Sequence, residues 1–236
     1  MLGFYNYTVV LTYISLCSAV TGIFTAIAGK GHPFIATACL MVCGCCDAFD
    51  GMVARSKKDR TEQEKRFGIQ IDSLVDLIAF GVLPCAICYA CYMSHHLDGF
   101  ILSDKLEFLR PIAAVKIPIF FIIFCLFVLA ALIRLAYFNV MEEERQKKTD
   151  EKMKFYQGLP VTSACLIFPT IMLIQYMVGK SFDISPYYVV ALLMTAILFV
   201  SKIRIKKPGM KGILIMVGIG AFEFVLLLIF RICYGH

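Results

Sequence analysis

The sequence predicts an all-α, polytopic transmembrane helix bundle, because it is too apolar for a water-soluble domain and its apolar residues fall in blocks of membrane-spanning length. The 236 residues are 60% hydrophobic and 17% charged, with a mean hydropathy of +0.79, whereas soluble domains carry about 25% charged residues. Most blocks approach the roughly 20 residues that a helix needs to cross about 30 Å of hydrocarbon. We expect one membrane-embedded domain over residues 1–236.

Seven apolar blocks are the expected spans. They run over Tyr7–Ala28, Pro33–Val53, Ile69–Met93, Ile112–Val140, Pro160–Val178, Pro186–Ser201 and Gly212–Tyr234. The sixth block is short for a span. The first is interpreted as a retained span rather than a signal peptide, because no Lys or Arg precedes it and no small-residue cleavage site follows it.

The basic residues indicate which side of the membrane each connector occupies. With a cytoplasmic N-terminus, segments 55–66, 141–158 and 202–211 face inward and hold sixteen of the 23 Lys and Arg residues. The outer connectors and span ends hold six, and Arg134 lies within a span. Because cytoplasmic loops are enriched in Lys and Arg, we expect an integral membrane protein whose N-terminus and basic connectors face the cytoplasm.

The net charge of +6 does not indicate a nucleic-acid partner. Lys and Arg lie between apolar blocks and form no basic stripe interleaved with aromatic residues, so membrane lipids and a polyphosphate substrate are the expected partners. The cysteines lie within apolar blocks, where Cys packs as a small hydrophobe, and no His stands at ligand spacing beside them. We therefore expect neither a disulfide framework nor a thiolate metal site.

Four acidic residues lie in or beside apolar spans: Asp47, Asp50, Asp72 and Asp76. The first two are three residues apart and the last two are four apart, so each pair shares one face of its helix. A short connector makes the two helices antiparallel neighbours, which lets the four carboxylates converge. Oxygen ligands favour hard cations such as Mg²⁺ or Mn²⁺. Four carboxylates can hold two ions about 3.5–4 Å apart, an arrangement suited to displacement at phosphorus.

Small residues and one arginine accompany the acids. Gly51, Ala54 and Gly68 remove side-chain bulk where a nucleotide and its phosphates would approach the helices. Arg55 supplies a planar, multidentate donor for phosphate oxygens. Small residues also ease helix packing, so each glycine alone favours packing. The whole set, in register with four acids, favours a phosphate site.

The pattern Asp-x2-Asp-Gly-x2-Ala-Arg, followed by Gly-x3-Asp-x3-Asp, resembles the signature of the CDP-alcohol phosphotransferase family, and every defining position is filled. The 12 residues between Arg55 and Gly68 exceed the family's usual spacing, and the additional residues are polar. We therefore expect a longer cytoplasmic connector beside an intact site. The resemblance implies a six-helix catalytic core, to which the seventh span is a C-terminal addition.

The resemblance also implies a role for each position. Asp47, Asp50 and Asp72 would be the principal metal ligands. Asp76 would ligate a metal and act as the general base on the acceptor hydroxyl. CDP-diacylglycerol would be the donor substrate, with CMP as the leaving group. The expected contacts to the CDP moiety are Gly51, Ala54, Arg55, Gly68 and, in the first span, Ser18.

Two later segments resemble the phosphatidylserine synthase branch of this family: AALIRLAYFNV at 130–140 and FYQGLPVTSA at 155–164. This likeness implies L-serine as the acceptor. Arg134 is the lone cation inside an apolar span, so it must face protein, water or an anion. A substrate carboxylate would satisfy it, as would snorkelling to lipid headgroups. The expected acceptor-binding residues are Arg134, Asn139, Gly158 and Pro160.

Other functions are weighed against this one. The same chemistry could use glycerol 3-phosphate or inositol phosphate, and a non-enzymatic alternative is a cation transporter. A transporter predicts acids near mid-membrane on several helices, whereas these cluster at one end. A phospholipase-D-like synthase needs paired His-x-Lys motifs, and none of the four His residues precedes a Lys by two. The sequence leaves the oligomeric state open, a homodimer included.

Overall fold

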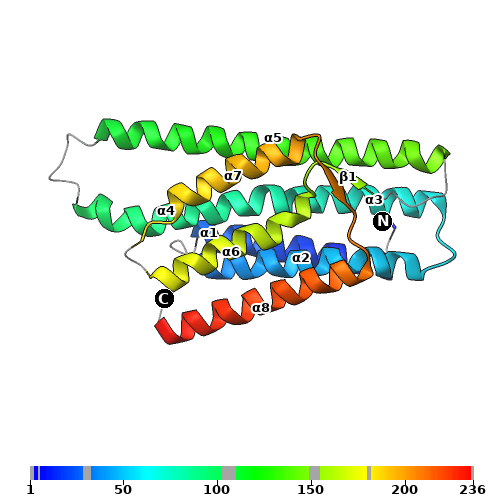
Figure 1. Cartoon of the computed structure of the whole chain (residues 1–236), viewed down its shortest axis with the longest axis horizontal. Coiled ribbons are helices and arrows are strands. Elements are labelled where there is room, and N and C mark those ends of the chain that lie inside the picture. The colour runs from blue at the N-terminus through cyan, green and yellow to red at the C-terminus, as the bar shows by residue number, and fades with distance from the viewer. Residues whose placement is uncertain are drawn as a thin grey trace.

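The computed structural model describes residues 3–4, 6–28, 33–102, 110–148, 155–179 and 182–234 (Figure 1). Within these ranges the side chains of residues 55, 95–102, 110–118 and 234 are not described. The α-helices are α1 (Val10–Ala28), α2 (Pro33–Ser56), α3 (Glu62–Asp76), α4 (Leu83–Leu102), α5 (Arg110–Lys148), α6 (Ala164–Val178), α7 (Ser185–Val200) and α8 (Met210–Tyr234). Short 3-10 turns at Tyr7–Val9 and Val161–Ser163 precede α1 and α6, and a π-helical segment, Leu77–Val82, joins α3 to α4.

The helices run back and forth along the long axis of the molecule, with the two chain ends towards opposite ends of the bundle (Figure 1). Within the described residues, six helical stretches are long and apolar enough to cross a membrane, which confirms the predicted all-α polytopic bundle. The sixth predicted span corresponds to α7, which has 16 residues and is therefore only about 24 Å long at 1.5 Å per residue. It lies against α5 and α4.

The third predicted span is part of a longer continuous helical stretch that begins at Glu62 rather than at Ile69. The earlier start is explained by a capping box. The Thr61 side chain accepts a hydrogen bond from the Glu64 backbone N–H (3.2 Å), and the Glu64 carboxylate accepts one from the Thr61 N–H (2.9 Å). Such reciprocal bonds satisfy the free N–H groups of a helix start. The polar connector is therefore short, and α2 and α3 lie close together.

The π-helical segment comes directly after Asp76 and widens the helix where the predicted carboxylate face ends. The Leu83 N–H donates to the Ile78 carbonyl, a bond across five residues. Gly81 lies at the contact with α5, where an added Cβ would be 3.4 Å from the Cβ of Ala131. Single π-helical turns are frequent at functional sites. Here the segment brings the backbone after Asp76 against α5.

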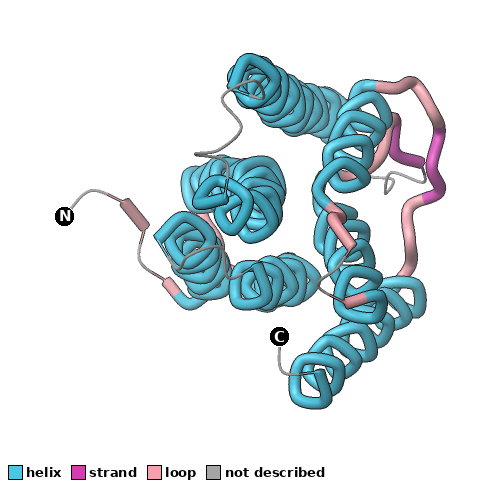
Figure 2. The backbone as a smooth tube through the Cα atoms, turned by 90° about the vertical axis from the view of Figure 1, so that its left-hand side faces the viewer, coloured by secondary structure: helices cyan, strands magenta, loops and turns pink. Residues whose placement is uncertain are grey.

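Two short strands form the part of the fold that the all-α prediction did not include. β1 (Phe155–Gln157) pairs antiparallel with β2 (Arg204–Lys206), with Gln157 opposite Arg204. Figure 2, which looks along the bundle, shows both strands outside the helices on one edge. The pairing ties the segment before α6 to the segment after α7.

The buried core includes residues of α1, α2, α4, α5, α6 and α7, and its aromatic side chains interlock between α5, α6 and α7. Phe168 stacks on Tyr188 with ring centroids 5.0 Å apart, and Phe127 lies 5.5–5.7 Å from Phe199 and Phe168. The last helix, α8, packs mainly on α6. The outward faces carry exposed apolar side chains, as expected where lipid is the solvent; examples are Phe24, Phe121, Phe222 and Ile232.

Candidate functional site

The carboxylates of Asp47, Asp50 and Asp72 converge between the end of α2 and the middle of α3. Each residue offers an oxygen atom, and these oxygens all lie within 4.8 Å of one another. Asp76 follows one helical turn after Asp72, is only 8% exposed, and interacts electrostatically with the other three. The structure thus brings the four predicted acids to one place. We call Asp47, Asp50, Asp72 and Asp76 the carboxylate cluster.

The carboxylate cluster is not balanced by any cation among the side chains that the structure describes. Among the residues whose side chains the structure describes, no Lys or Arg forms an ion pair with any of its four members. Four ionised groups this close repel one another strongly in a low-dielectric interior. A set of oxygen donors only, with excess negative charge, fits hard divalent cations. The residues therefore fit the divalent metal ions that the sequence predicted.

The signature glycines and alanine border the carboxylate cluster. Gly51 and Ala54 follow Asp47 by four and seven residues on α2, so they share its face. Gly68 lies one turn before Asp72 on α3. Arg55 belongs to α2, but its side chain lies outside the described residues. At Gly68, the guanidinium of Arg60 lies 2.7 Å from where a Cβ would be.

The structure places Ser18 away from the cluster. Its hydroxyl donates to the carbonyl of Cys39 (3.1 Å), eight residues before Asp47 and hence about 12 Å along α2. This bond joins α1 to α2 and gives Ser18 a packing role. Its contact with CDP stays a prediction.

The sequence analysis missed a polar face, nearer the cluster, that runs from the 3-10 turn Tyr7–Val9 into α1. Thr8, Thr12 and Ser15 are all buried, and the Ser15 carbonyl accepts a hydrogen bond from the thiol of Cys43, one turn before Asp47. The spacing i, i+4, i+7 of hydroxyl residues in an apolar span was a readable signal, because it marks one helix face.

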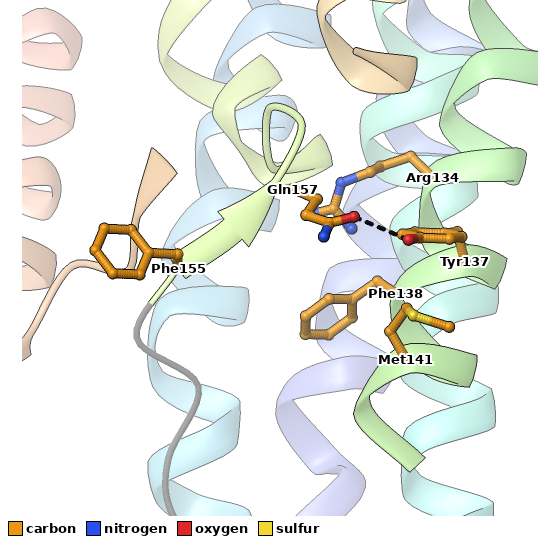
Figure 3. Close-up of a pocket in the computed structure, with 6 residues that line it drawn as sticks. All are labelled: Arg134, Tyr137, Phe138, Met141, Phe155 and Gln157. Carbon is orange, nitrogen blue, oxygen red and sulfur yellow. Dashed lines mark hydrogen bonds between the residues drawn. The ribbon is translucent and has the colours of Figure 1, made fainter. Parts of the chain in front are cut away.

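Arg134 lies in a second pocket, formed by α5 and β1 (Figure 3). The pocket has a volume of about 180 Å³ and is lined by Arg134, Tyr137, Phe138, Met141, Phe155 and Gln157; we call it the α5–β1 pocket. Arg134 is only 6% exposed, its guanidinium lies over the Phe138 ring at 5.2 Å, and its Nε has no hydrogen-bond partner. Tyr137 donates to the Gln157 side-chain carbonyl (2.8 Å). The pocket thus offers a cation and polar groups to a small anion.

Asn139 lies beside the carboxylate cluster rather than in the α5–β1 pocket. Its side-chain amide donates to the hydroxyl of Ser73 (2.7 Å), next to Asp72 on α3. Asn139 comes five positions after Arg134 on α5, so the two side chains point about 140° apart around the helix. The helix therefore presents one predicted acceptor residue to α3 and the other to β1.

Gly158 and Pro160 have evident structural tasks. Gly158 has φ +76°, and a Cβ there would lie 2.5 Å from the Phe199 carbonyl oxygen, so only glycine fits without strain. Its N–H donates to the Ile203 carbonyl (2.8 Å). Pro160 is the N-cap of the 3-10 turn Val161–Ser163, which precedes α6. Both residues shape the return of the chain beside the α5–β1 pocket.

Tyr137 and Gln157 were quoted within the sequence motifs but not selected as site residues. The signal that could have found them is the pairing of their two segments, because each motif supplies one wall of the pocket. Contact between a helix and a short strand is not visible in local periodicity.

Comparison with known proteins places these features in context. The sequence model of a family described as CDP-alcohol phosphatidyltransferase matches residues 5–202, which include the carboxylate cluster and the α5–β1 pocket and stop before β2 and α8. Three curated relatives share the name CDP-diacylglycerol–serine O-phosphatidyltransferase.

The relative from Mycobacterium tuberculosis is 24% identical over 198 residues, covering 84% of this chain and 59% of its own. The relative from Saccharomyces cerevisiae is 28% identical over 186 residues, with 74% and 57% covered. The relative from Helicobacter pylori is 31% identical over 162 residues, with 67% and 54% covered. The chain thus spans somewhat more than half the length of the curated relatives it matches.

Proposed function

Because the chain belongs to the CDP-alcohol phosphatidyltransferase family, we propose that it transfers a phosphatidyl group from CDP-diacylglycerol to the hydroxyl of L-serine. The products are phosphatidylserine and CMP. The observation that carries the proposal is the convergence of three carboxylates within 4.8 Å, with the buried Asp76 beside them. The shared name of the relatives supports serine as the acceptor.

The carboxylate cluster would hold the metal. Asp47, Asp50 and Asp72 supply the oxygen ligands, and we propose two Mg²⁺ or Mn²⁺ ions, which when bound neutralise the diphosphate and make its phosphorus electrophilic. Gly51 and Ala54, on the same face of α2 as Asp47, add little side-chain bulk where the nucleotide would bind. The protein's task is then to position the donor beside the acceptor hydroxyl.

Asp76 is the proposed general base. It accepts the proton of the serine hydroxyl while the serine oxygen forms a bond to the phosphorus that carries diacylglycerol. The bond between that phosphorus and the oxygen bridging to CMP breaks, and CMP leaves with the electron pair. A buried carboxylate next to the other acids is suited to this task, because a base must lie within hydrogen-bond reach of the proton it removes.

The α5–β1 pocket is the proposed source of acceptor selectivity. A guanidinium that is buried, with one donor unused, stabilises an anion that can take that hydrogen bond. Serine carries a carboxylate and is small enough for a pocket of about 180 Å³. We propose that Arg134 contacts this carboxylate and that Asn139 orients α3 through Ser73.

We propose that the carboxylate cluster faces the cytoplasm. The connector between α2 and α3 and the segments that form β1 and β2 follow helices that end at the cluster's end of the bundle. These are the connectors that hold sixteen Lys and Arg residues. Enrichment of positive charge on one side is the known signature of cytoplasmic loops.

A CMP-release assay on the purified protein in detergent tests the proposal. With CDP-diacylglycerol and Mg²⁺ or Mn²⁺, L-serine should release CMP faster than glycerol 3-phosphate or inositol phosphate at equal concentrations. If glycerol 3-phosphate or inositol phosphate releases CMP faster than serine does, that compound is the acceptor instead of serine. No CMP release with any acceptor, together with gradient-dependent cation uptake in vesicles, would favour the transporter alternative instead.

A further inference from the structure

The connector between α2 and α3 contains an arginine to which neither the signature nor the proposed mechanism gives a role. Arg60 lies within the 12 residues that separate Arg55 from Gly68, a spacing longer than is usual for this signature. It is the residue immediately before Thr61, the N-cap of α3. Its position is therefore set by the start of the helix that carries Asp72.

The connector is held in place by a hydrogen-bond network around Glu64. The Glu64 carboxylate accepts from the Thr61 N–H (2.9 Å), from Lys57 Nζ (2.9 Å) and from the Asn6 side-chain amide (3.1 Å). Phe4 packs edge-on against Phe67, with ring centroids 5.5 Å apart. These contacts join the N-terminal segment, the connector and the first turn of α3. They hold in place the part of the connector that contains Arg60.

The Arg60 guanidinium lies across two signature positions. Its Nη1 donates to the Ala54 carbonyl (3.3 Å) and its Nη2 to the Glu64 carbonyl (3.3 Å). The same Nη2 is 2.7 Å from where a Cβ on Gly68 would be. The arginine therefore occupies the space that the glycine leaves free, one turn before Asp72 and at the end of α2 that carries the other ligands.

Arg60 has unused capacity to bind an anion. Its Nε is buried and has no hydrogen-bond partner. Among the side chains that the structure describes, no carboxylate forms an ion pair with it. Its two bonds go to neutral carbonyls and are long. A guanidinium presents five donors in a planar fork that matches phosphate oxygens, and a buried donor without an acceptor is costly.

A purely structural explanation accounts for only part of this arrangement. A link between the end of α2 and the start of α3 would explain the two bonds to carbonyl oxygens. It would not explain why a permanent charge without a counter-ion is placed over Gly68 with a buried donor unused. An incoming phosphate would supply both the counter-ion and the missing acceptor.

We propose that Arg60 binds a phosphate oxygen of the CDP group, so that the long connector adds a cation to the nucleotide side of the site. This inference rests on the proposed use of a CDP-linked donor but not on the identity of the acceptor. Arg60 is thus a substrate-binding residue that lies outside the signature. The carboxylate cluster and Arg60 approach the diphosphate from two sides.

Equilibrium binding of cytidine, CMP and CDP to the purified protein with Mg²⁺ tests the role directly, without turnover. The Arg60→Gln variant should bind CMP and CDP about ten-fold or more weakly, the effect of losing a charged hydrogen bond, and should bind cytidine as the wild type does. Arg60→Lys should lose less, because the charge remains. The matched control is Lys58→Gln, an exposed cation in the same connector, which should change none of the three affinities.

Kinetics provide the second measurement. The KM for CDP-diacylglycerol should rise in Arg60→Gln, while the KM for whichever acceptor the protein uses stays constant. Equal losses for cytidine and CMP together with a lower melting temperature would show a structural link and overturn the proposal. Tighter CMP binding by Arg60→Gln would also overturn it, because Arg60 would then compete with the nucleotide. The binding measurements with cytidine, CMP and CDP do not depend on the acceptor. If serine proves not to be the acceptor, the proposal for Arg60 can therefore still be tested.

Discussion

The carboxylate cluster and the α5–β1 pocket differ in the kind of structure that positions their side chains. The cluster is built from two consecutive helices, and its members lie between residues 47 and 76. The pocket joins α5 to β1, and β1 is held by pairing with β2, about 50 residues further on. The cluster is therefore specified by spacing along two helices, whereas one wall of the pocket also depends on strand pairing with a distant segment.

This difference separates what each region does. A local arrangement suits the chemistry that every acceptor shares, since the ligands to a metal must keep one geometry. A pocket with one wall on a strand outside the helices can vary without disturbing that geometry, which suits selectivity. We expect changes in the cluster to affect turnover with any acceptor, and changes around the α5–β1 pocket to affect serine alone.

The largest expected effect is in the cluster. Asp72→Asn should lower kcat with every acceptor by about 10³-fold or more, the scale seen when a key stabilising group at a transition state is lost. Removal of metal by EDTA should have the same effect on the wild type, reversed by Mg²⁺ or Mn²⁺. Asp59→Asn, an exposed acid in the connector, is the control for charge. Full activity of the wild type without metal would contradict a metal role.

The second prediction tests whether Asp76 acts as the general base rather than only as a metal ligand. Asp76→Asn should reduce kcat by about 10²-fold, within the range for general-base catalysis, because a carboxamide cannot accept the serine proton. Binding of CMP with Mg²⁺ should be weakened less than in Asp72→Asn. The kcat is measured with saturating substrates, and the affinity for CMP is measured without turnover. A kcat close to that of the wild type would remove Asp76 from the role of base.

The third effect concerns the pocket and sharpens the comparison. Arg134→Lys keeps the charge but loses the planar fork, and it should raise the KM for serine several-fold. Arg134→Ala should raise it by about 10- to 150-fold, since a charged hydrogen bond contributes about 1.5–3 kcal/mol. The KM for CDP-diacylglycerol should change little, because the substitution removes a contact to the acceptor only.

Serinol, which lacks the carboxylate, is the matched substrate for this test. It should be a poor acceptor for the wild type and should lose little more in Arg134→Ala. As a protein control, Arg66→Lys changes an exposed arginine paired with Glu62 and should leave both KM values unchanged. An equal rise in the KM for serinol and serine would show that Arg134 does not recognise the carboxylate.

The smallest effect is structural. Gly158→Ala should lower the melting temperature, because a left-handed backbone and a Cβ 2.5 Å from the Phe199 carbonyl together cost about 1–3 kcal/mol. Gly218→Ala, in α8 with open space around it, should leave stability unchanged or raise it slightly. The melting temperatures of the two variants are measured by thermal unfolding in the same detergent. Identical melting temperatures would show that the turn before α6 tolerates a side chain.

The sequence by itself determined the helices and the carboxylate cluster. Hydrophobic blocks of spanning length require helices in lipid, because every backbone polar group must be bonded within its own segment. Acids spaced by three or four residues must share a helix face, and a short connector must make the helices neighbours. Asp47, Asp50, Asp72 and Asp76 were therefore located by periodicity alone.

Only the tertiary structure decided the relations between distant segments. It placed Ser18 beside Cys39 rather than beside the acids, turned Arg134 towards β1 while Asn139 meets Ser73, and laid Arg60 over Gly68. The physical reason is that helical periodicity specifies which residues share a face but not which neighbour that face meets. That choice depends on packing among all the helices and on strand pairing, to which each residue contributes only a small part.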